Sequence, residues 1–465
     1  MPRISSRASV VRSRLASFDA SRLRPGIHNP GRAVVAAFAV GVVVGTLVLL
    51  LPVSRQGPDR TSLLEALFTA TSALCVTGLA VVDTATHWSV FGQVTILALV
   101  QVGGLGFMTL ASLLGLLISR RLGLGSRMLA ATETKSLGLG DVRSVVLGVA
   151  RVSLTAEAVT AAVLATRFVT HYDHSIGSGL WHGVFHAVSA FNNAGFALYS
   201  DSLVGFAADP WVCLPVAAAV IVGGLGFPVI LELLRQHRRP RRWSVHTRLT
   251  LTMTAVLLLA GTLFITVAEW SNPGTLGALD GPGRVLAGFF QAVMPRTAGF
   301  NSVDFGQMNT GTLLGVDVLM FIGGGSAGTA GGIKVGTFAI LLVAIVAELR
   351  GSPDVDLFDR RLPPTAIRQA LSVALLSVAA VVGSTMVIAS TSPYTLDEIL
   401  FEVVSAFATV GLSTGITADL APAHQLILTA LMFAGRLGPV TLASALVLRE
   451  HPRAFRRPEG RPLIG

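Results

Sequence analysis

Four short segments of the chain align with one another without a gap, and this internal repeat limits the possible folds more than any other feature. Each begins with phenylalanine and ends with glycine ten positions later: FTATSALCVTG (68–78), FHAVSAFNNAG (185–195), FFQAVMPRTAG (289–299) and FEVVSAFATVG (401–411). Three carry Ser-Ala at the same place, where the third reads Val293-Met294 and is followed by Pro295. Such self-similarity indicates one structural unit used several times.

A second, glycine-rich signature follows each of these segments. It reads VGGLGF at both 102–107 and 222–227, IGGGSAG at 322–328 and AGRLGP at 434–439. Because both signatures recur in the same order, the sequence predicts four tandem copies of one unit.

The composition places these units in a membrane. Only 13% of the residues are charged and 52% are hydrophobic, and the mean hydropathy is +0.69. A soluble globular chain carries about 25% charged residues. This surplus of apolar residues exceeds what one water-soluble core can bury, which excludes a cytosolic enzyme, a disordered scaffold and a secreted disulfide-rich protein. Cys75 and Cys213 lie in separate apolar runs and predict two buried thiols.

Helix lengths follow from the apolar runs. A helix needs about 20 mostly apolar residues to cross a bilayer. Eight runs reach that length: 33–53, 89–118, 145–166, 209–234, 249–269, 312–347, 366–391 and 423–448. Four shorter runs predict half-helices that enter the membrane and return: 62–75, 180–192, 284–295 and 397–408. The expected fold is an all-α integral membrane protein with eight transmembrane helices, in which four span–half-helix–span repeats surround a pseudo-fourfold pore.

The distribution of Lys and Arg predicts the orientation. Most of these residues gather at the two ends of the chain and in three loops between spans, as the positive-inside bias requires. This bias explains the net charge of +10 without nucleic-acid binding. We expect a multi-pass protein of the cell inner (plasma) membrane with both termini cytoplasmic and the half-helices on the outer side. The expected divisions are an N-terminal segment 1–32, repeats at 33–119, 120–235, 236–348 and 349–448, and a tail 449–465.

Four such units favour the passage of a cation. A half-helix that enters from outside directs its C-terminal end, which carries about half a negative charge, toward the membrane centre. Rings of backbone carbonyls in the return segments can replace the hydration shell of a potassium ion. Glycine suits this turn because it adopts positive φ and leaves space for an ion. The predicted filter residues are Val76, Thr77, Gly78, Asn193, Ala194, Gly195, Thr297, Ala298, Gly299, Thr409, Val410 and Gly411.

Acidic residues follow three of the four glycines. Asp83, Asp201 and Asp304 come five or six positions later. On the outer face they would raise the local cation concentration. The alternative is that they are ordinary solvated loop residues.

These motifs resemble those of the Trk/Ktr/HKT superfamily of potassium transporters, and most closely its KtrB/TrkH-like pore subunits, KtrB in particular. The likeness covers about 33–448. It implies a potassium uptake pore, with K⁺ as the transported ion and no organic cofactor. In this superfamily glycine in all four filters accompanies potassium selectivity, and Gly78 completes that set. Selectivity over sodium is expected to be modest, because only Thr409-Val410-Gly411 is close to the filter of tetrameric potassium channels. The resemblance also implies a homodimer and a cytoplasmic nucleotide-binding ring of the KtrA/TrkA kind, besides contact with membrane lipid.

The third repeat contains a run of glycines inside its second predicted span. The segment GGGSAGTAGGIK (323–334) cannot easily hold a regular helix, because each glycine costs about 1 kcal/mol relative to alanine. In the superfamily this segment is an intramembrane gate loop. The residues carried over are Gly323, Gly324, Gly325, Ser326, Gly328, Gly331, Gly332 and Lys334. The alternative is close helix packing through small residues.

Arg436 occupies the position of Gly104, Gly224 and Gly324 in the other repeats. An arginine at mid-span is costly and marks a functional site. It would repel permeating cations or bind carbonyls of the gate loop, and the superfamily has an arginine here that contributes to the pore barrier. The alternative is an ion pair with a buried carboxylate such as Asp317.

Two other functional classes remain open. One is a secondary active symporter that couples potassium uptake to sodium or protons. Transporters of that kind often use inverted repeats, whereas these four repeats share one topology. The other is a membrane enzyme, for which the sequence offers no catalytic constellation. Glu402 is expected to be structural. Glu157, Glu232 and Glu269 are expected near span ends, solvated or paired. His182 and His186, one turn apart, are expected in a polar outer rim, with a zinc pair as the alternative.

Overall fold

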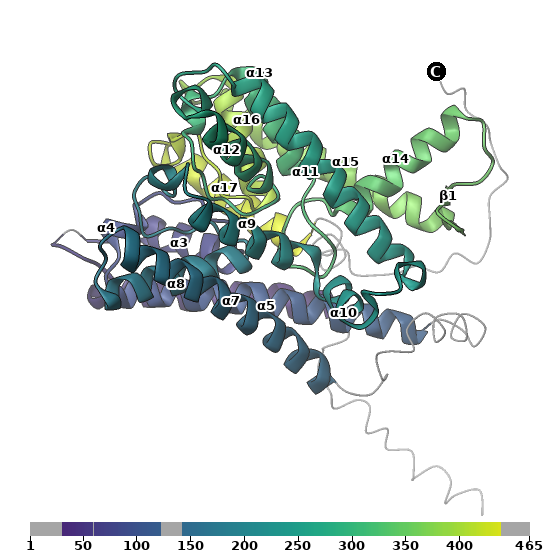
Figure 1. Ribbon diagram of the computed structural model, residues 1–465, viewed down its shortest axis with the longest axis horizontal. Coiled ribbons are helices and arrows are strands. Elements are labelled where there is room, and N and C mark those ends of the chain that lie inside the picture. Colours follow the sequence, from purple (N-terminus) through teal and green to yellow (C-terminus); the bar gives the residue numbers. More distant parts are fainter. Residues whose placement is uncertain (1–29, 59, 122–141, 439–465) are drawn as a thin grey trace, which may run out of the picture.

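The structure, a computed structural model, describes residues 30–58, 60–121 and 142–438 (Figure 1). Most of the predicted segment 1–32, much of the loop before the second repeat and the predicted tail 449–465 lie outside these ranges. Within them the chain is helical apart from one small hairpin, formed by β1 (Asp356–Leu357) and β2 (Arg360–Arg361). Cys75 and Cys213 are free and buried, which confirms the prediction of two separate thiols.

In the part of the chain that the structure describes, four long helices are apolar enough to cross a membrane. These are α5 (Val90–Arg121), α7 (Val142–His171), α11 (Val245–Glu269) and α15 (Pro364–Ala389). A fifth crossing is formed if α9 (Pro210–Leu225) and α10 (Phe227–Gln236) are taken together, although they are bent by 100° at Gly226. The protein is therefore a membrane protein with several apolar spans.

Two predicted spans are not continuous helices, and a third is described only in part. The prediction of one helix over 209–234 is wrong, because Gly226 and Pro228 break it into α9 and α10. The run 312–347 is divided into α13 (Thr310–Phe321) and α14 (Val335–Leu349), as its glycines predicted. The last run contains α17 (Pro422–Leu437), just before the described residues end. The first predicted span corresponds to α2 (Pro30–Leu49).

Four short helices lie where half-helices were predicted. They are α3 (Leu63–Leu74), α8 (Ile176–Phe191), α12 (Gly281–Val293) and α16 (Leu396–Ala408). Each begins at a polar N-cap residue, which satisfies backbone amides that have no partner within the helix. Ser62 with Glu65 and Thr395 with Glu398 form capping boxes, and Ser175 and Asp280 accept from the first turn. The remaining elements are α4 (Thr84–His87) and the short 3₁₀ turns η2 (Pro52–Ser54), η3 (Val204–Phe206), η4 (Pro240–Arg242), η5 (Leu276–Ala278), η6 (Phe305–Gln307) and η7 (Ile416–Ala418).

The short helices pack inside the bundle, each against at least two neighbouring helices. Helix α3 lies against α2 and α5, α8 against α7 and α9, α12 against α11 and α9, and α16 against α13 and α17 (Figure 1). Each aligned segment contributes a fully buried phenylalanine: Phe68, Phe185, Phe290 and Phe401. This packing surrounds the C-terminal ends of the short helices with protein.

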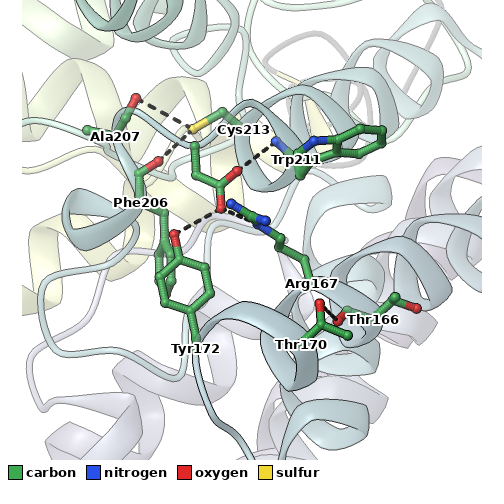
Figure 2. A network of polar contacts seen from close by, with 9 residues as sticks. Thr166, Arg167, Thr170, Tyr172, Phe206, Ala207, Trp211 and Cys213 are labelled. Atoms are coloured by element: carbon green, nitrogen blue, oxygen red, sulfur yellow. Dashed lines mark hydrogen bonds and ion pairs between the residues drawn. The ribbon is translucent and has the colours of Figure 1, made fainter. Parts of the chain in front are cut away.

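A charged network joins α7 to α9 just before α9 begins (Figure 2). Asp209 caps α9 through the Trp211 amide at 2.9 Å and accepts from Arg167 Nε at 2.8 Å and Tyr172 OH at 2.9 Å. Burial acts to raise the pKa of Asp209, but these hydrogen bonds outweigh it and hold the pKa below its ordinary value. Burial, reinforced by Asp209, raises the pKa of Tyr172 to about 12, so its hydroxyl remains a donor at neutral pH.

Substitution of Asp209 by Asn should lower the thermal midpoint of the detergent-solubilised protein. It removes a buried charge that Arg167 and Tyr172 face, at a cost of about 1–3 kcal/mol. Because the folded-state pKa of Asp209 is depressed, its stabilisation is present above the unfolded-state pKa and is lost as pH falls through the folded value. The difference in midpoint between wild type and D209N should therefore shrink below about pH 4. A difference that is constant down to pH 3 would contradict this assignment.

Candidate functional site

The four aligned segments share an uncommon backbone conformation at the ends of the short helices. Two residues before each final glycine, a residue with a side chain adopts positive φ: Val76 (57°), Asn193 (58°), Thr297 (68°) and Thr409 (52°). The glycines also have positive φ: Gly78 (94°), Gly195 (70°), Gly299 (77°) and Gly411 (95°). A left-handed residue other than glycine costs about 1–3 kcal/mol and tends to occur at functional sites. The glycines were expected to turn the chain, but the left-handed residues before them were not.

Hydrogen bonds explain how three of these helix ends hold that conformation. In α3 the Thr77 amide donates to the Ser72 carbonyl at 2.8 Å, and the Val76 amide donates to the Ala73 carbonyl at 3.1 Å. The same pair of bonds ends α8 and α16, which is the arrangement known as a Schellman motif. The segment that contains Pro295 departs, since there the Ala298 amide donates to the Met294 carbonyl at 2.9 Å.

The serine common to three segments has a specific partner in two of them. Ser72 Oγ accepts from the Gly78 amide at 3.0 Å, and Ser405 Oγ accepts from the Gly411 amide at 3.1 Å. These bonds fix the glycine amide toward its own short helix.

The four glycines approach one another in a closed ring. A Cβ added to Gly78 would lie 3.1 Å from the Gly195 Cα, and one added to Gly195 would lie 2.8 Å from the Gly299 Cα. A Cβ on Gly299 would lie 3.2 Å from the Gly411 Cα, and one on Gly411 would lie 3.0 Å from the Gly78 Cα. Residues more than 300 positions apart in sequence, Gly78 and Gly411, thus meet in one ring, and none of the four positions has space for a side chain.

A cavity of about 280 Å³ adjoins this ring. All four glycines contribute to its wall, together with Phe196, Asn301 and Ser413 among others. Of the three aspartates predicted to attract cations, only Asp83 is among the residues that line it, and its carboxylate accepts from Ser200 Oγ at 2.5 Å. Asp201 and Asp304 are exposed, and Asp304 caps η6 through the Gly306 amide.

The packing of the helices explains the second, glycine-rich signature. In three of the four repeats its first glycine packs directly on the C-terminal turn of the short helix in the same repeat, whereas Gly323 of the third repeat packs on Gly331. Added Cβ atoms on Gly103, Gly223 and Gly435 would overlap the carbonyl oxygens of Leu74, Phe191 and Phe407, respectively, which occupy one aligned position. Close approach of the two backbones therefore requires glycine.

The glycine-rich segment 322–334 lies against three of the four predicted filter segments. Thr329 Oγ1 is 2.9 Å from the Asn193 side-chain amide, and Thr297 Oγ1 accepts from the Gly331 amide at 3.2 Å. A Cβ on Gly331 would lie 2.6 Å from the Ala408 carbonyl oxygen. The segment is irregular rather than helical, with Ala327 at φ 57° and Gly332 at φ 61°. Lys334 Nζ donates to the carbonyls of Ala330 (2.5 Å) and Gly331 (3.3 Å) within the segment itself.

Arg436 of α17 binds this segment and α5 together. Its guanidinium donates to the Thr329 carbonyl and, at 3.2 Å, to the Gly103 carbonyl, and it lies 4.7 Å from the centre of the Phe107 ring. The side chain is only 2% exposed. The described residues contain no ion pair between Arg436 and Asp317, so of the two sequence-based alternatives the carbonyl contacts are the ones found.

Buried polar side chains also hold the loops that follow the glycines. In three repeats, a side chain on the short helix accepts from the amide three residues beyond the glycine: His186 from Leu198 (3.3 Å), Glu402 from Thr414 (3.0 Å) and, with the side-chain amide oriented so that its oxygen faces the loop, Gln291 from Ser302 (2.7 Å). Glu402 was expected to be structural, and its contacts agree. Glu157 was expected near a span end, and this prediction is wrong. It is buried within α7 and accepts from Ser153, Gln101 and Asn192.

His182 and His186 lie in an aromatic cluster, in which their two rings are stacked with their centres 6.0 Å apart. Within the described ranges, no group of three or more His, Cys, Asp or Glu residues could hold a metal ion.

The chain is similar to known cation transport proteins over most of its length. A family model described as "TrkH: Cation transport protein" matches residues 5–456. The chain is 41% identical to the Ktr system potassium uptake protein B of Bacillus subtilis, covering 94% of this chain and 97% of that protein. It is 40% identical to the protein of the same name from Vibrio alginolyticus, covering 92% and 93%. It is 33% identical to the potassium/sodium uptake protein NtpJ of Enterococcus hirae, covering 94% and 97%.

A solved structure has the same fold. The crystal structure of the potassium transporter TrkH from Vibrio parahaemolyticus superimposes with a TM-score of 0.72 at 16% identity, covering 91% of this chain and 86% of that one. The matches confirm the predicted resemblance and a transport protein rather than an enzyme. The chain belongs to the TrkH family of cation transport proteins.

Proposed function

We propose that this chain is the pore-forming subunit of a potassium uptake system. The observation that carries the proposal is the closed ring of Gly78, Gly195, Gly299 and Gly411, each just beyond the C-terminal end of a short helix. Four helix C-termini favour a cation at their common focus. The names of the relatives from B. subtilis and V. alginolyticus point to potassium as that cation.

In this proposal the four repeats surround one pseudo-fourfold pore with eight membrane crossings. K⁺ enters the outer cavity past Asp83 and sheds water as the carbonyls of residues 76–78, 193–195, 297–299 and 409–411 replace it. The hydrogen bonds from Gly78 to Ser72 and from Gly411 to Ser405 support this role, because they keep the backbone in place without using the carbonyl oxygens.

The segment 322–334 is the gate, and Arg436 completes the barrier. The segment contacts three of the four proposed filter loops, and the guanidinium fixes it through the Thr329 carbonyl. A fixed positive charge there also repels a cation that has passed the filter. Conduction therefore requires the segment and Arg436 to move away from the axis.

The same proposal covers the assembly. The chain lies in the inner plasma membrane with both termini in the cytoplasm. It forms a homodimer with one pore in each subunit, and a cytoplasmic nucleotide-binding partner binds to it. The word "system" in the names of the Ktr relatives supports a multi-component assembly.

The deciding experiment is growth of a potassium-uptake-deficient bacterium at micromolar potassium. Expression of the chain with a nucleotide-binding partner of the Ktr type should restore growth and rubidium uptake that potassium inhibits. The matched control is R436A, which is expressed in the same strain to show that uptake follows the state of the pore. Absence of rubidium uptake in both, with the protein present in the membrane, would overturn the proposed function.

The alternative function, symport of potassium with sodium or protons, is not favoured. Sodium conduction should nevertheless be measured separately, because the relative NtpJ is named for both potassium and sodium. The buried carboxylates Glu157, Glu269 and Glu402 each accept hydrogen bonds from neutral groups, which binds them into local structure rather than a relay. Rubidium uptake should therefore persist when sodium is replaced by choline and when the proton gradient is collapsed at constant membrane potential.

A further inference from the structure

The break between α9 and α10 leaves backbone groups without helical partners. In a continuous α-helix the residue 227 amide would donate to the carbonyl of Gly223, and the residue 228 amide to that of Gly224. Gly226 has φ 94° and ends α9, and α10 leaves at 100°. Residue 228 is a proline and has no amide hydrogen. The carbonyls of Gly223 and Gly224 and the amide of Phe227 are thus all freed inside the protein.

The glycine-rich segment 322–334 satisfies all three freed groups. The Gly325 amide donates to the Gly224 carbonyl at 2.7 Å, and the Thr329 amide donates to the Gly223 carbonyl at 3.2 Å. The Phe227 amide donates in turn to the Ala327 carbonyl at 3.1 Å. Gly226 also lets the Ser326 carbonyl oxygen approach, because a Cβ there would overlap that atom.

We propose that the α9–α10 break is the seat that holds the segment 322–334 in its closed position, and that Gly226 and Pro228 are positioning residues for gating. This inference rests on the proposed function, in which that segment is the gate. The seat belongs to the second repeat and the segment to the third, so the second repeat sets the position of the gate through three backbone hydrogen bonds. Arg436 then acts from the fourth repeat on the Thr329 carbonyl.

The first repeat provides a natural reference for the test. Its residues 102–108 read VGGLGFM and are entirely helical within α5, whereas residues 222–228 read VGGLGFP and are broken. The substitution Pro228→Met makes the two heptapeptides identical. It restores an amide that competes with Gly325 for the Gly224 carbonyl.

The test compares P228M with P215M, which removes a proline from α9 away from the break. Both full-length variants and the wild type are reconstituted in liposomes without the cytoplasmic partner. P228M should raise basal rubidium flux about 2- to 10-fold, as expected for the loss of one hydrogen bond. The preference for rubidium over sodium should be unchanged, because the filter is intact. Hydrogen–deuterium exchange of the peptide covering 323–334 should be faster in P228M only.

The outcomes separate the inference from the function on which it rests. If R436A raises flux while P228M leaves both flux and exchange at wild-type values, the seat is refuted and the pore remains. A P228M variant that loses ion selectivity as well would also refute it, since that result indicates general damage. If P228M does not reach the membrane, hydrogen–deuterium exchange of the wild-type protein tests the proposal instead. Rapid exchange of the Gly325 and Thr329 amides in the closed protein overturns the proposal, and slow exchange supports it.

Discussion

Replacement of Gly78 by serine is expected to reduce potassium-over-sodium selectivity about tenfold and to lower potassium uptake as well. Gly78 has φ 94°, and a non-glycine residue held at a sparsely populated backbone angle costs about 1–3 kcal/mol. The new Cβ would overlap the Ala194 carbonyl oxygen, which belongs to the adjacent filter segment. Relief of that overlap must tilt or displace a proposed ligand oxygen, and a change of 1.4 kcal/mol in ion discrimination is about tenfold.

Competition of sodium against rubidium uptake measures this effect. Gly336→Ser is the matched control, because Gly336 lies in α14 and no neighbouring heavy atom lies within 4 Å of a Cβ at that position. G336S should keep wild-type selectivity. Equal sodium inhibition in G78S and wild type would remove Gly78 from the filter.

Replacement of Arg436 by alanine is expected to raise basal rubidium flux about tenfold or more in the absence of a partner. A hydrogen bond to a charged group contributes about 1.5–3 kcal/mol, and the guanidinium makes one to the Thr329 carbonyl of the proposed gate segment. Loss of this bond should release that segment, and the substitution also removes a fixed positive charge from the proposed cation path. The effect should exceed that of P228M, which weakens one neutral bond.

Arg436→Lys serves as the control for charge alone. Lysine keeps the positive charge but cannot reach the Thr329 and Gly103 carbonyls with the same forked geometry. An intermediate flux in R436K would show that charge and bonding both contribute. Wild-type flux in R436A, measured on protein incorporated to the same level, would exclude a barrier role for this residue.

Much of the site was visible in the sequence because it is built from repeated local motifs. Each aligned segment carries an apolar run of half-helix length, a polar N-cap before it and a glycine after it, so α3, α8, α12 and α16 could be predicted along with the glycines at their ends. Two features of the structure were not predicted from the sequence. The break at Gly226 has a sequence signal, the proline at 228 that its counterpart in α5 lacks. The left-handed Val76 has none, because a β-branched residue disfavours that conformation on its own.

The sequence by itself determined that this chain is a membrane protein of four related units with a glycine turn in each, since composition and periodicity act locally. Tertiary structure alone decided which units meet and what each copy of a motif becomes. The hexapeptide VGGLGF is helical at 102–107 and broken at 222–227, where the segment from the third repeat binds the freed backbone. Likewise, Arg436 finds its partners in Thr329 and Gly103, far away in sequence. Hydrogen-bond partners brought by distant parts of the chain outweigh local preference there, because a buried backbone group left without a partner costs about 1–3 kcal/mol, whereas Gly226 adopts its positive φ without a Cβ penalty.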